Sequence, residues 1–433
     1  MSIAQQANAA RQAAHFLAFA SDSTRARALF TAAEHIENQA RTILSENAMD
    51  VQAAKEAGLM APLISRLALS EEKITEMCAG LRSVASLPDP LGKTLLATEL
   101  VEGLTLYRVS CPIGVIGAIF ESRPDALTQI AALCVKSGNA VLLKGGREAS
   151  RSCRALFAAM DRAARESGLP IGWAALLESR EEVAEMLKQD DQIDLIIPRG
   201  SNEFVQYIKD NSRIPVLGHA AGICHVYVDR AADVGMAVLI AVDAKTQYVA
   251  VCNAVETLLV HRDIADAALP ALAEALRAKG VLLRGCDRTR AIIDCEPATQ
   301  ADWDTEYLDL VLSIRVVDST IDAIDHINRH GSGHTDAIVT DDESAANLFC
   351  ARVDSASVFW NCSTRFSDGY RYGFGAEVGI ATGKTHARGP MGIDGLCTYK
   401  YKLLGSGQTI SAGVQYTFRS LNDKCPLEDS ARC

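Results

Sequence analysis

The stretch IGVIGAIFESRPDALTQIAALCVKSGNAVLLKGG (residues 113–146) decides the fold. It opens with a short, continuous apolar run and continues with a helix-forming segment that Pro124 precedes and Gly138 follows. It ends in a second apolar run at 140–144. Two apolar runs of strand length joined by a helix are typical of neighbouring parallel strands in a sheet buried on both faces. We therefore expect a β-α-β unit here.

The same alternation continues beyond this unit. It predicts a parallel, doubly wound sheet, and such sheets bind nucleotides at the carboxyl ends of their strands. Further strands are expected at 174–177, 193–198 and 214–217, with helices ending near Met186 and spanning 201–208. A second α/β domain is expected from apolar runs at 223–229, 255–261, 310–317 and 336–340, with helices at 233–246 and 265–280.

Composition excludes several classes of protein. The chain has 433 residues and a net charge of −11, which argues against binding to nucleic acid or to acidic membranes. No apolar run reaches the roughly 18–20 residues of a membrane span. The 13 cysteines show no CxxC pair and no metal-ligand spacing, so no metal site is expected. The N-terminus lacks a secretory signal, and a cytoplasmic location is expected.

Three polar motifs are candidates for chemistry, each with a structural alternative. Lys144, Gly200 and Ser201 follow predicted strands, where they would face a phosphate or ribose or would simply form turns. Cys252 lies between a helix and a strand, although a lone cysteine usually serves packing. The planar guanidinium of arginine binds carboxylates and phosphates well, but an arginine in a loop is often exposed to solvent without binding a ligand. The Gly-rich segments 359–380 and 385–392 carry Arg365, Arg371, His386 and Arg388.

Taken in their order along the chain, the motifs and the predicted strands and helices resemble the aldehyde dehydrogenase superfamily over roughly residues 10–405. The resemblance rests on residues 111–149, IDLIIPRGSNEFVQYI, IPVLGH, GICHVYVD, DAKTQY, CNAVETLLVH, STRFSDGYRYGFGAEVGI and HARGPMG. It implies an aldehyde dehydrogenase-like α/β fold with two doubly wound domains and a small β oligomerisation flap. The expected boundaries are 1–225 with about 389–396 for the cofactor domain, 226–388 for the catalytic domain, 98–112 with 396–416 for the flap, and 420–433 for a mobile tail.

The resemblance also implies the catalytic residues. Cys252 stands at the position of the family's catalytic thiol, and its backbone N–H is the expected donor to the oxyanion. Asn253 follows in the same loop and is a further catalytic candidate. Ser122 stands where many members have an oxyanion asparagine. Val216 occupies the position of the glutamate that activates water in hydrolytic members. Without that base water is a poor acceptor, which favours an acyl-phosphate reductase.

The cofactor and substrate residues follow from the same resemblance. NADPH is the implied cofactor, with Lys144, Arg147, Glu148, Gly200, Ser201 and Glu306 as its candidate ligands. Arg365, Arg371, His386 and Arg388 become candidates for the acyl phosphate and the carboxylate of the substrate.

The implied activity is NADPH-dependent reduction of L-glutamyl 5-phosphate to L-glutamate 5-semialdehyde through a cysteinyl thioester, the second step of proline biosynthesis. Two alternatives stay open: a CoA-acylating or free-aldehyde-oxidising member of the superfamily, and a non-catalytic homologue. A homodimer or homotetramer is expected, and a glutamate kinase is a candidate partner because glutamyl phosphate is labile.

Overall fold

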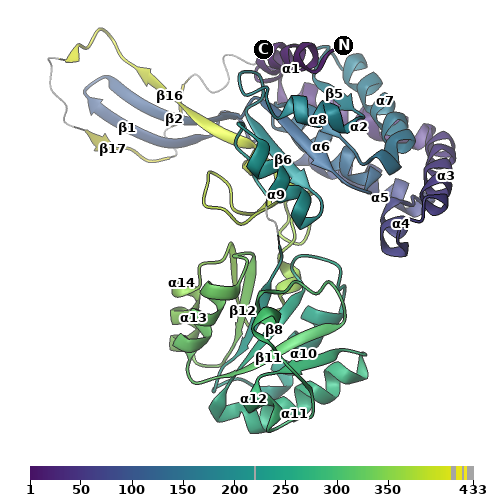
Figure 1. Cartoon of the computed structure of the whole chain (residues 1–433). Helices are drawn as coiled ribbons and strands as arrows, with labels where there is room; N and C mark the ends of the chain where they lie inside the picture. Colours follow the sequence, from purple (N-terminus) through teal and green to yellow (C-terminus); the bar gives the residue numbers. More distant parts are fainter. Residues whose placement is uncertain (219–220, 411–415, 422–423, 427–433) are drawn as a thin grey trace. The chain divides into compact units, whose positions relative to one another are not determined.

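The computed structural model describes residues 1–433 except 219–220, 411–415, 422–423 and 427–433 (Figure 1). The chain forms two compact units. Unit 1 comprises Met1–Leu217, Phe374–Gly379 and Met391–Cys433, and unit 2 comprises Gly218–Gly373 and Ile380–Pro390. The chain first passes from unit 1 to unit 2 between Leu217 and Gly218, before the strand Cys224–Val228. The predicted boundary after residue 225 is therefore too late, because it would cut a strand that pairs wholly within unit 2.

Unit 1 contains a four-stranded parallel sheet in the order β5-β4-β3-β6. Its strands are β3 (Val115–Phe120), β4 (Ala140–Lys144), β5 (Ala174–Leu177) and β6 (Leu195–Arg199). The predicted β-α-β unit is therefore confirmed. The predicted strand at 214–217 is wrong, because only Val216 forms an isolated bridge, with Ile196, at the edge of the sheet.

The helices of unit 1 cover this sheet and one another. The helix α6 (Pro124–Lys136) is almost wholly buried, and it ends before Gly138, whose φ of +72° suits glycine. The other helices are α1 (Ile3–Leu17), α2 (Asp22–Asn38), α3 (Ala40–Glu56), α4 (Ala61–Leu67), α5 (Glu71–Ser86), α7 (Ser150–Glu166), α8 (Arg180–Met186) and α9 (Asn202–Asn211), with 3-10 turns at Arg147–Ala149 and Ile393–Leu396.

A separate antiparallel sheet in unit 1 has the order β16-β2-β1-β17, drawn as a long ribbon in Figure 1. It consists of β1 (Thr94–Val101), β2 (Leu104–Pro112), β16 (Cys397–Leu404) and β17 (Thr417–Phe418). The strand expected near 98–112 is thus two strands, because the chain turns at Gly103 with φ +72°.

Part of the predicted tail packs against this sheet. Cys425 is 2% exposed, lies among Ala97, Tyr107 and Val109, and donates its backbone N–H to Thr94 Oγ1 at 3.1 Å. The prediction of a mobile tail is therefore wrong at Cys425, since a buried apolar contact fixes it there. Residues 420, 421, 424 and 426 of the predicted tail are exposed, and its residues 422–423 and 427–433 lie outside the described residues.

Unit 2 contains a seven-stranded, wholly parallel sheet in the order β10-β9-β11-β8-β7-β12-β13. The strands are β7 (Cys224–Val228), β8 (Val255–His261), β9 (Leu282–Gly285), β10 (Glu296–Pro297), β11 (Val311–Val317), β12 (Thr335–Val339) and β13 (Ser357–Trp360). The helices are α10 (Val234–Thr246), α11 (Arg262–Ala278), α12 (Asp287–Arg290), α13 (Thr320–His330) and α14 (Glu343–Arg352), with 3-10 turns at Gln300–Asp304 and Thr364–Phe366. Two short strands, β14 (Gly379–Ala381) and β15 (Gly389–Met391), pair with each other.

Helices cover both faces of the unit 2 sheet. Val226 and Val228 of β7 belong to a core with the buried residues of α10 and α11, whereas Tyr227 belongs to a core with α13 and α14. Successive side chains of a strand point to opposite faces, so a sheet buried on both faces needs the unbroken apolar runs found here. The doubly wound fold predicted for this part of the chain is confirmed.

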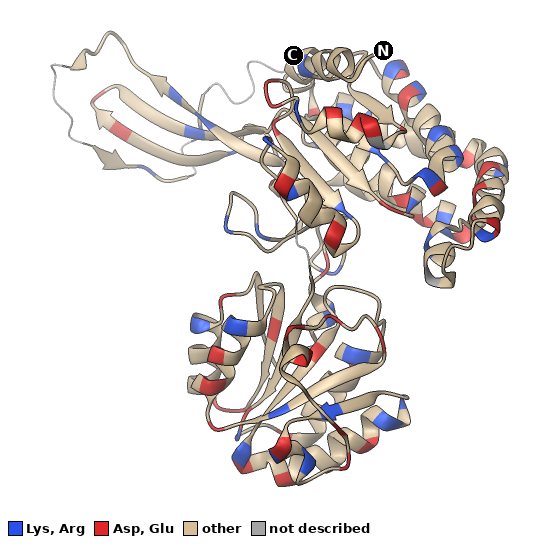
Figure 2. Ribbon diagram, in the orientation of Figure 1, with Lys and Arg blue, Asp and Glu red and all other residues tan. Residues whose placement is uncertain are grey.

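The charged residues lie mostly on the helices and loops, and few lie on the strands of the two parallel sheets (Figure 2). Within the described part of the chain no helix is long and apolar enough to cross a membrane. The same residues include no group of three His, Cys, Asp or Glu side chains arranged to hold a metal ion. All cysteines in the described ranges are free thiols.

Candidate active site

Cys252 lies in a turn between α10 and β8 of unit 2. Helix α10 begins after its cap Asp233, is apolar as far as Val242, and ends at Thr246. Strand β8 is buried at every position. Both elements are therefore fixed by the core of unit 2, and the connection at 247–254 presents a half-buried Cys252 at the amino end of β8.

His334 contacts the sulfur of Cys252. His334 Nε2 lies 3.2 Å from Cys252 Sγ, and His334 Nδ1 lies 2.8 Å from Thr335 Oγ1. His334 is 1% exposed and directly precedes β12, which pairs with β7, and β7 in turn pairs with β8. The sequence analysis missed this residue. His334 comes shortly before a predicted strand, as the segment with Cys252 does, but the order of the strands is needed to see that the two residues meet.

The backbone around Cys252 is packed closely. A Cβ atom at Gly222 would lie 2.2 Å from the carbonyl oxygen of Cys252 and 2.4 Å from its Cα, so only glycine fits there. The Cys224 thiol donates to the same carbonyl at 3.2 Å. Burial raises the pKa of Cys224 well above its usual range, so this thiol stays protonated beside Cys252.

Asn253 ties the thiol loop to the turn at Thr364–Phe366. Asn253 Nδ2 donates to the carbonyl of Ser367 at 2.9 Å, and the Thr364 hydroxyl donates to the carbonyl of Asn253 at 2.7 Å. Asn253 is 4% exposed. These two hydrogen bonds hold the loop in shape, and the catalytic role of Asn253 stays a prediction.

The four predicted substrate residues divide into two groups. Arg365 is 9% exposed, and its Nε donates to Gln247 Oε1 at 3.0 Å, which brings it to the thiol loop. Burial lowers the pKa of Arg365, and Arg371 adds to this, whereas Asp368 and Cys252 oppose it. Arg371 is exposed, with its guanidinium 5.9 Å from the centre of the Phe366 ring.

Arg388 and His386 lie further along unit 2. The Arg388 guanidinium donates to the carbonyl of Thr382 at 3.3 Å, to the carbonyl of Asp354 at 2.9 Å and to Asp354 Oδ1 at 3.3 Å. Its donors are thus engaged in holding loops together, and a substrate role would require these contacts to break. His386 is exposed.

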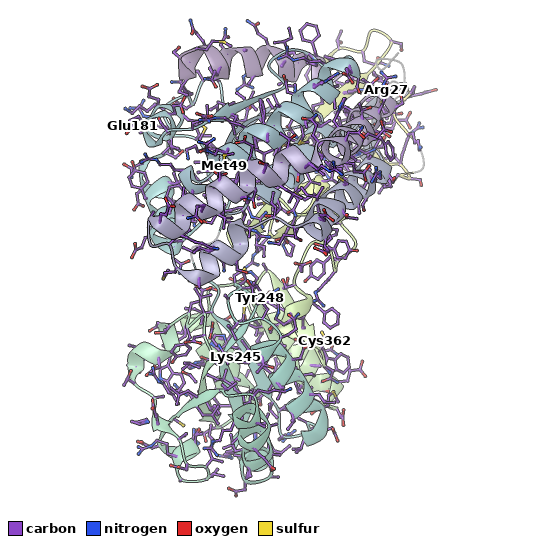
Figure 3. All side chains as sticks on the ribbon, turned by 90° about the vertical axis from the view of Figure 1, so that its right-hand side faces the viewer. Arg27, Met49, Glu181, Lys245, Tyr248 and Cys362 are labelled. Carbon is purple, nitrogen blue, oxygen red and sulfur yellow. The ribbon has the colours of Figure 1, made fainter. Side chains whose placement is uncertain are left out.

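A buried ion pair lies beneath the thiol loop. Lys245 Nζ lies 2.5 Å from Glu256 Oε2, and both side chains are 0% exposed. Figure 3 labels Lys245 and Tyr248; α10 ends between them, and Tyr248 is exposed. Burial raises the pKa of Glu256 to about 7 and lowers that of Lys245. Glu256 Oε1 also accepts from the backbone of Leu308, whose φ is +54°, and so fixes the turn beside Glu306.

All the predicted cofactor residues except Glu306 of unit 2 lie at or after the carboxyl ends of β4 and β6 in unit 1, and Ser122 lies after β3 of the same sheet. The Ser122 backbone N–H and hydroxyl both donate to Glu148 Oε1, at 2.7 and 2.6 Å. The predicted oxyanion role of Ser122 would require this hydroxyl contact to break. Lys144 is buried and donates to the carbonyl of Gly145, whereas Arg147 is exposed.

The amino end of α9 is capped in a similar way. Ser201 Oγ accepts from the backbone N–H of Phe204 at 3.4 Å, and the Ser201 N–H donates to Glu121 Oε2 at 3.0 Å. Gly200 precedes this cap and is exposed, and a Cβ there would meet Glu121 at 2.6 Å. Structure thus brings Ser122, Lys144, Glu148 and Ser201 to one edge of the sheet.

Comparisons with known proteins agree with this arrangement. The model of the aldehyde dehydrogenase family matches residues 1–282. A gamma-glutamyl phosphate reductase of Pelotomaculum thermopropionicum is 58% identical over 97% of each chain, and that of Acetivibrio thermocellus is 57% identical over 99% of this chain and 100% of the relative. The crystal structure of gamma-glutamyl phosphate reductase from Thermotoga maritima superposes with a TM-score of 0.92 at 40% identity, covering 94% of this chain and 100% of that one.

The chain therefore belongs to the aldehyde dehydrogenase family and, within it, to the gamma-glutamyl phosphate reductases. The resemblance and the aldehyde dehydrogenase-like fold predicted from the sequence motifs are confirmed.

Proposed function

We propose that the chain reduces L-glutamyl 5-phosphate to L-glutamate 5-semialdehyde and phosphate, with NADPH as reductant, in proline biosynthesis. The observation that carries the proposal is the half-buried Cys252 thiol on a fixed loop, 3.2 Å from the His334 ring, in a chain 58% identical to a gamma-glutamyl phosphate reductase. A thiolate is a strong nucleophile toward acyl groups, and acyl phosphates carry a good leaving group.

In the first step the Cys252 thiolate attacks the acyl carbon. A carbon–sulfur bond forms, the bond from carbon to the bridging phosphate oxygen breaks, and phosphate leaves. The backbone N–H of Cys252 is the expected donor to the oxygen that becomes negative. NADPH, when bound, supplies the hydride that reduces the thioester. The carbon–sulfur bond then breaks, which releases the aldehyde and restores the thiolate.

The edge of the unit 1 sheet fits a dinucleotide. Lys144, exposed Arg147 and the exposed amino end of α9 lie at the carboxyl ends of parallel strands, where phosphates and riboses bind in such folds. Lys144, Glu148 and Ser201 would hold the adenosine and pyrophosphate portions. Arg147 is proposed to contact the 2′-phosphate that distinguishes NADP from NAD, and Glu306 of unit 2 to contact the nicotinamide ribose.

Arg365 is the candidate best placed to bind the anionic substrate. Its guanidinium is buried next to the thiol loop, and a buried guanidinium is a strong donor to an anion. Arg371 and His386 are exposed and remain proposed contacts for the glutamate carboxylate.

The antiparallel sheet of unit 1 is proposed to join copies of the chain into a dimer or tetramer. Tyr399, Tyr401 and Leu403 alternate along β16, so they share one face, and they are 49%, 59% and 52% exposed. Exposed apolar faces and unpaired edges are usually covered by a partner. A Tyr401→Lys variant is expected to lower the molar mass measured by light scattering.

The reverse reaction tests the proposed activity. Purified enzyme receives L-glutamate 5-semialdehyde, NADP⁺ and phosphate, and the absorbance of NADPH is followed. The wild type is expected to form NADPH only with phosphate, and Cys252→Ala to form none. Cys350→Ala is a matched control, because Cys350 is an exposed thiol on α14 of the same unit.

Other outcomes would overturn the proposal. NADPH formed without phosphate would mean that water accepts the acyl group, and a requirement for CoA would point to an acylating dehydrogenase. No reaction with any acceptor, from a folded wild-type protein, would favour a non-catalytic homologue.

A further inference from the structure

We infer that His334 is a catalytic residue: it takes the proton of the Cys252 thiol and passes it to the departing phosphate. This inference rests on the proposed function, because it assigns the proton transfer of that reaction. Neither the sequence motifs nor the predicted residues included His334.

The first argument is the position of the ring. Nε2 lies 3.2 Å from Cys252 Sγ, which is within hydrogen-bond distance for sulfur. Nδ1 lies 2.8 Å from the Thr335 hydroxyl, so the nitrogen that does not face the thiol has a fixed partner. A nucleophile, a base and a group that orients the base form the arrangement expected of an activated thiol.

The second argument is that the backbone holds the ring in place. The carbonyl of His334 accepts from the Ser357 N–H at 3.0 Å, and the carbonyl of Gly333 accepts from the Ala356 N–H at 2.8 Å. The φ of Gly333 is +70°, a conformation that favours glycine and turns the chain immediately before His334. The side chain is 1% exposed, so it cannot swing into solvent without local opening.

The third argument is that the other nearby groups are already engaged. The Glu256 carboxylate is fully buried and paired with Lys245 and the backbone of Leu308. The Cys224 thiol donates to the carbonyl of Cys252 and stays protonated. The guanidinium of Arg365 accepts no proton. Across the described residues, His334 is the side chain that bonds to the Cys252 sulfur.

The proton transfer balances. The thiol proton moves from Cys252 Sγ to His334 Nε2 as the carbon–sulfur bond forms, which leaves an imidazolium. The imidazolium gives this proton to the phosphate as its bond to the acyl carbon breaks. After hydride reduction, the thiolate leaves the aldehyde carbon and takes one proton from solvent, which restores the starting thiol and neutral imidazole.

Alkylation of Cys252 tests the inference without relying on turnover. Wild type, His334→Ala and His334→Gln are treated with iodoacetamide at pH 6.5 and 8.5, and the peptide containing Cys252 is quantified by mass spectrometry. Exposed Cys350 in the same sample is the internal reference. Loss of the base is expected to lower alkylation of Cys252 at pH 6.5 about tenfold relative to Cys350, with a smaller loss at pH 8.5.

Two further measurements separate a chemical role from a structural one. In the reverse reaction His334→Ala is expected to lose about 10²–10⁴-fold in kcat with little change in KM, and added imidazole is expected to restore part of it. His330→Gln is the matched control: His330 is a buried histidine of the same unit that contacts Asp304, and its replacement is expected to leave alkylation of Cys252 unchanged.

The results distinguish the two proposals. Normal alkylation and normal kcat in folded His334→Gln, with a phosphate-dependent wild type, would overturn the role of His334 alone. A wild type that lacks the phosphate-dependent reaction but shows His334-dependent alkylation would overturn the proposed function, leaving an activated thiol whose substrate is different.

Discussion

The two units carry parallel sheets of the same kind, yet their candidate functional residues lie at opposite ends of the strands. In unit 1 they follow the carboxyl ends of β3, β4 and β6. In unit 2 Cys252 and His334 precede β8 and β12, at the amino ends. The carboxyl-terminal edge is the usual ligand site of such folds, so unit 1 follows the general rule and unit 2 departs from it.

The state of the polar groups also differs between the units. At the edge of unit 1 Glu148 and Glu121 occupy the donors of Ser122 and Ser201. A cofactor that uses these donors has to displace the carboxylates. In unit 2 the thiol already faces its base at 3.2 Å. A binding edge can rearrange around its ligand, whereas a nucleophile is effective only when its geometry is fixed in advance.

The largest effect that would break this comparison is expected at Gly222. Gly222→Ala places a Cβ 2.2 Å from the Cys252 carbonyl and forces the thiol loop to move. A displacement of about 1 Å can cost about 10²-fold in rate, so we expect kcat to fall about 100-fold. NADPH affinity, measured by fluorescence, is expected to stay within about twofold. Normal kcat in this variant would show that the loop tolerates movement.

A pair of arginines sharpens the comparison within unit 2. Arg365→Ala is expected to raise KM for phosphate in the reverse reaction about 10- to 100-fold, because a buried charge that binds an anion is lost. Arg388→Ala is expected to change that KM less than about threefold but to lower the free energy of unfolding by about 1 kcal/mol, since it loses its contacts with Asp354. A larger KM effect at Arg388 would reverse the assignment.

In unit 1, Arg147→Ala is expected to weaken binding of NADP⁺ about tenfold and to leave binding of NAD⁺ unchanged, because only NADP⁺ carries the 2′-phosphate. Titration calorimetry with both cofactors measures the difference. Equal losses of affinity for the two cofactors would mean that Arg147 contacts a part of the dinucleotide that NAD⁺ and NADP⁺ share.

A buried histidine of unit 2 is expected to make stability depend on pH. Burial, with the neighbouring His225, lowers the pKa of His326 from 6.5 to about 2. Unfolding therefore takes up a proton below pH 6.5, so the stabilisation from neutral His326 is present above that pH and is lost as the pH falls. The free energy of unfolding should drop by about 1.4 kcal/mol per pH unit between roughly pH 6 and 4.

His326→Phe is expected to flatten this slope. Urea unfolding followed by the fluorescence of Trp303, whose ring centre lies 5.5 Å from that of His326, reports on unit 2. Trp173 of unit 1 and Trp360 of unit 2 would be replaced by phenylalanine first. An unchanged slope would mean that His326 is not the group that takes up the proton.

Much of the fold was predictable because local patterns decide it. The runs at 140–144 and 174–177 match β4 and β5, and the motif around Cys252 matches the loop before β8. His334 was not predictable, because it meets Cys252 only after β12 pairs with β7. The strand β13 was also missed, since Ser357–Trp360 is short and runs into a loop rich in polar residues. Cys425 packs through contacts that no local pattern contains.

The order of the segments along the chain has a consequence for synthesis on the ribosome. The sheet of unit 2 is complete once Trp360 has emerged, and nearly all of its residues come from one continuous stretch. Strand β2 at Leu104–Pro112 must wait for β16 at Cys397–Leu404, which follows the whole sheet of unit 2 in the chain. The N-terminal unit is thus completed after unit 2, and the edge of β2 that pairs with β16 stays open to chaperones while unit 2 is synthesised.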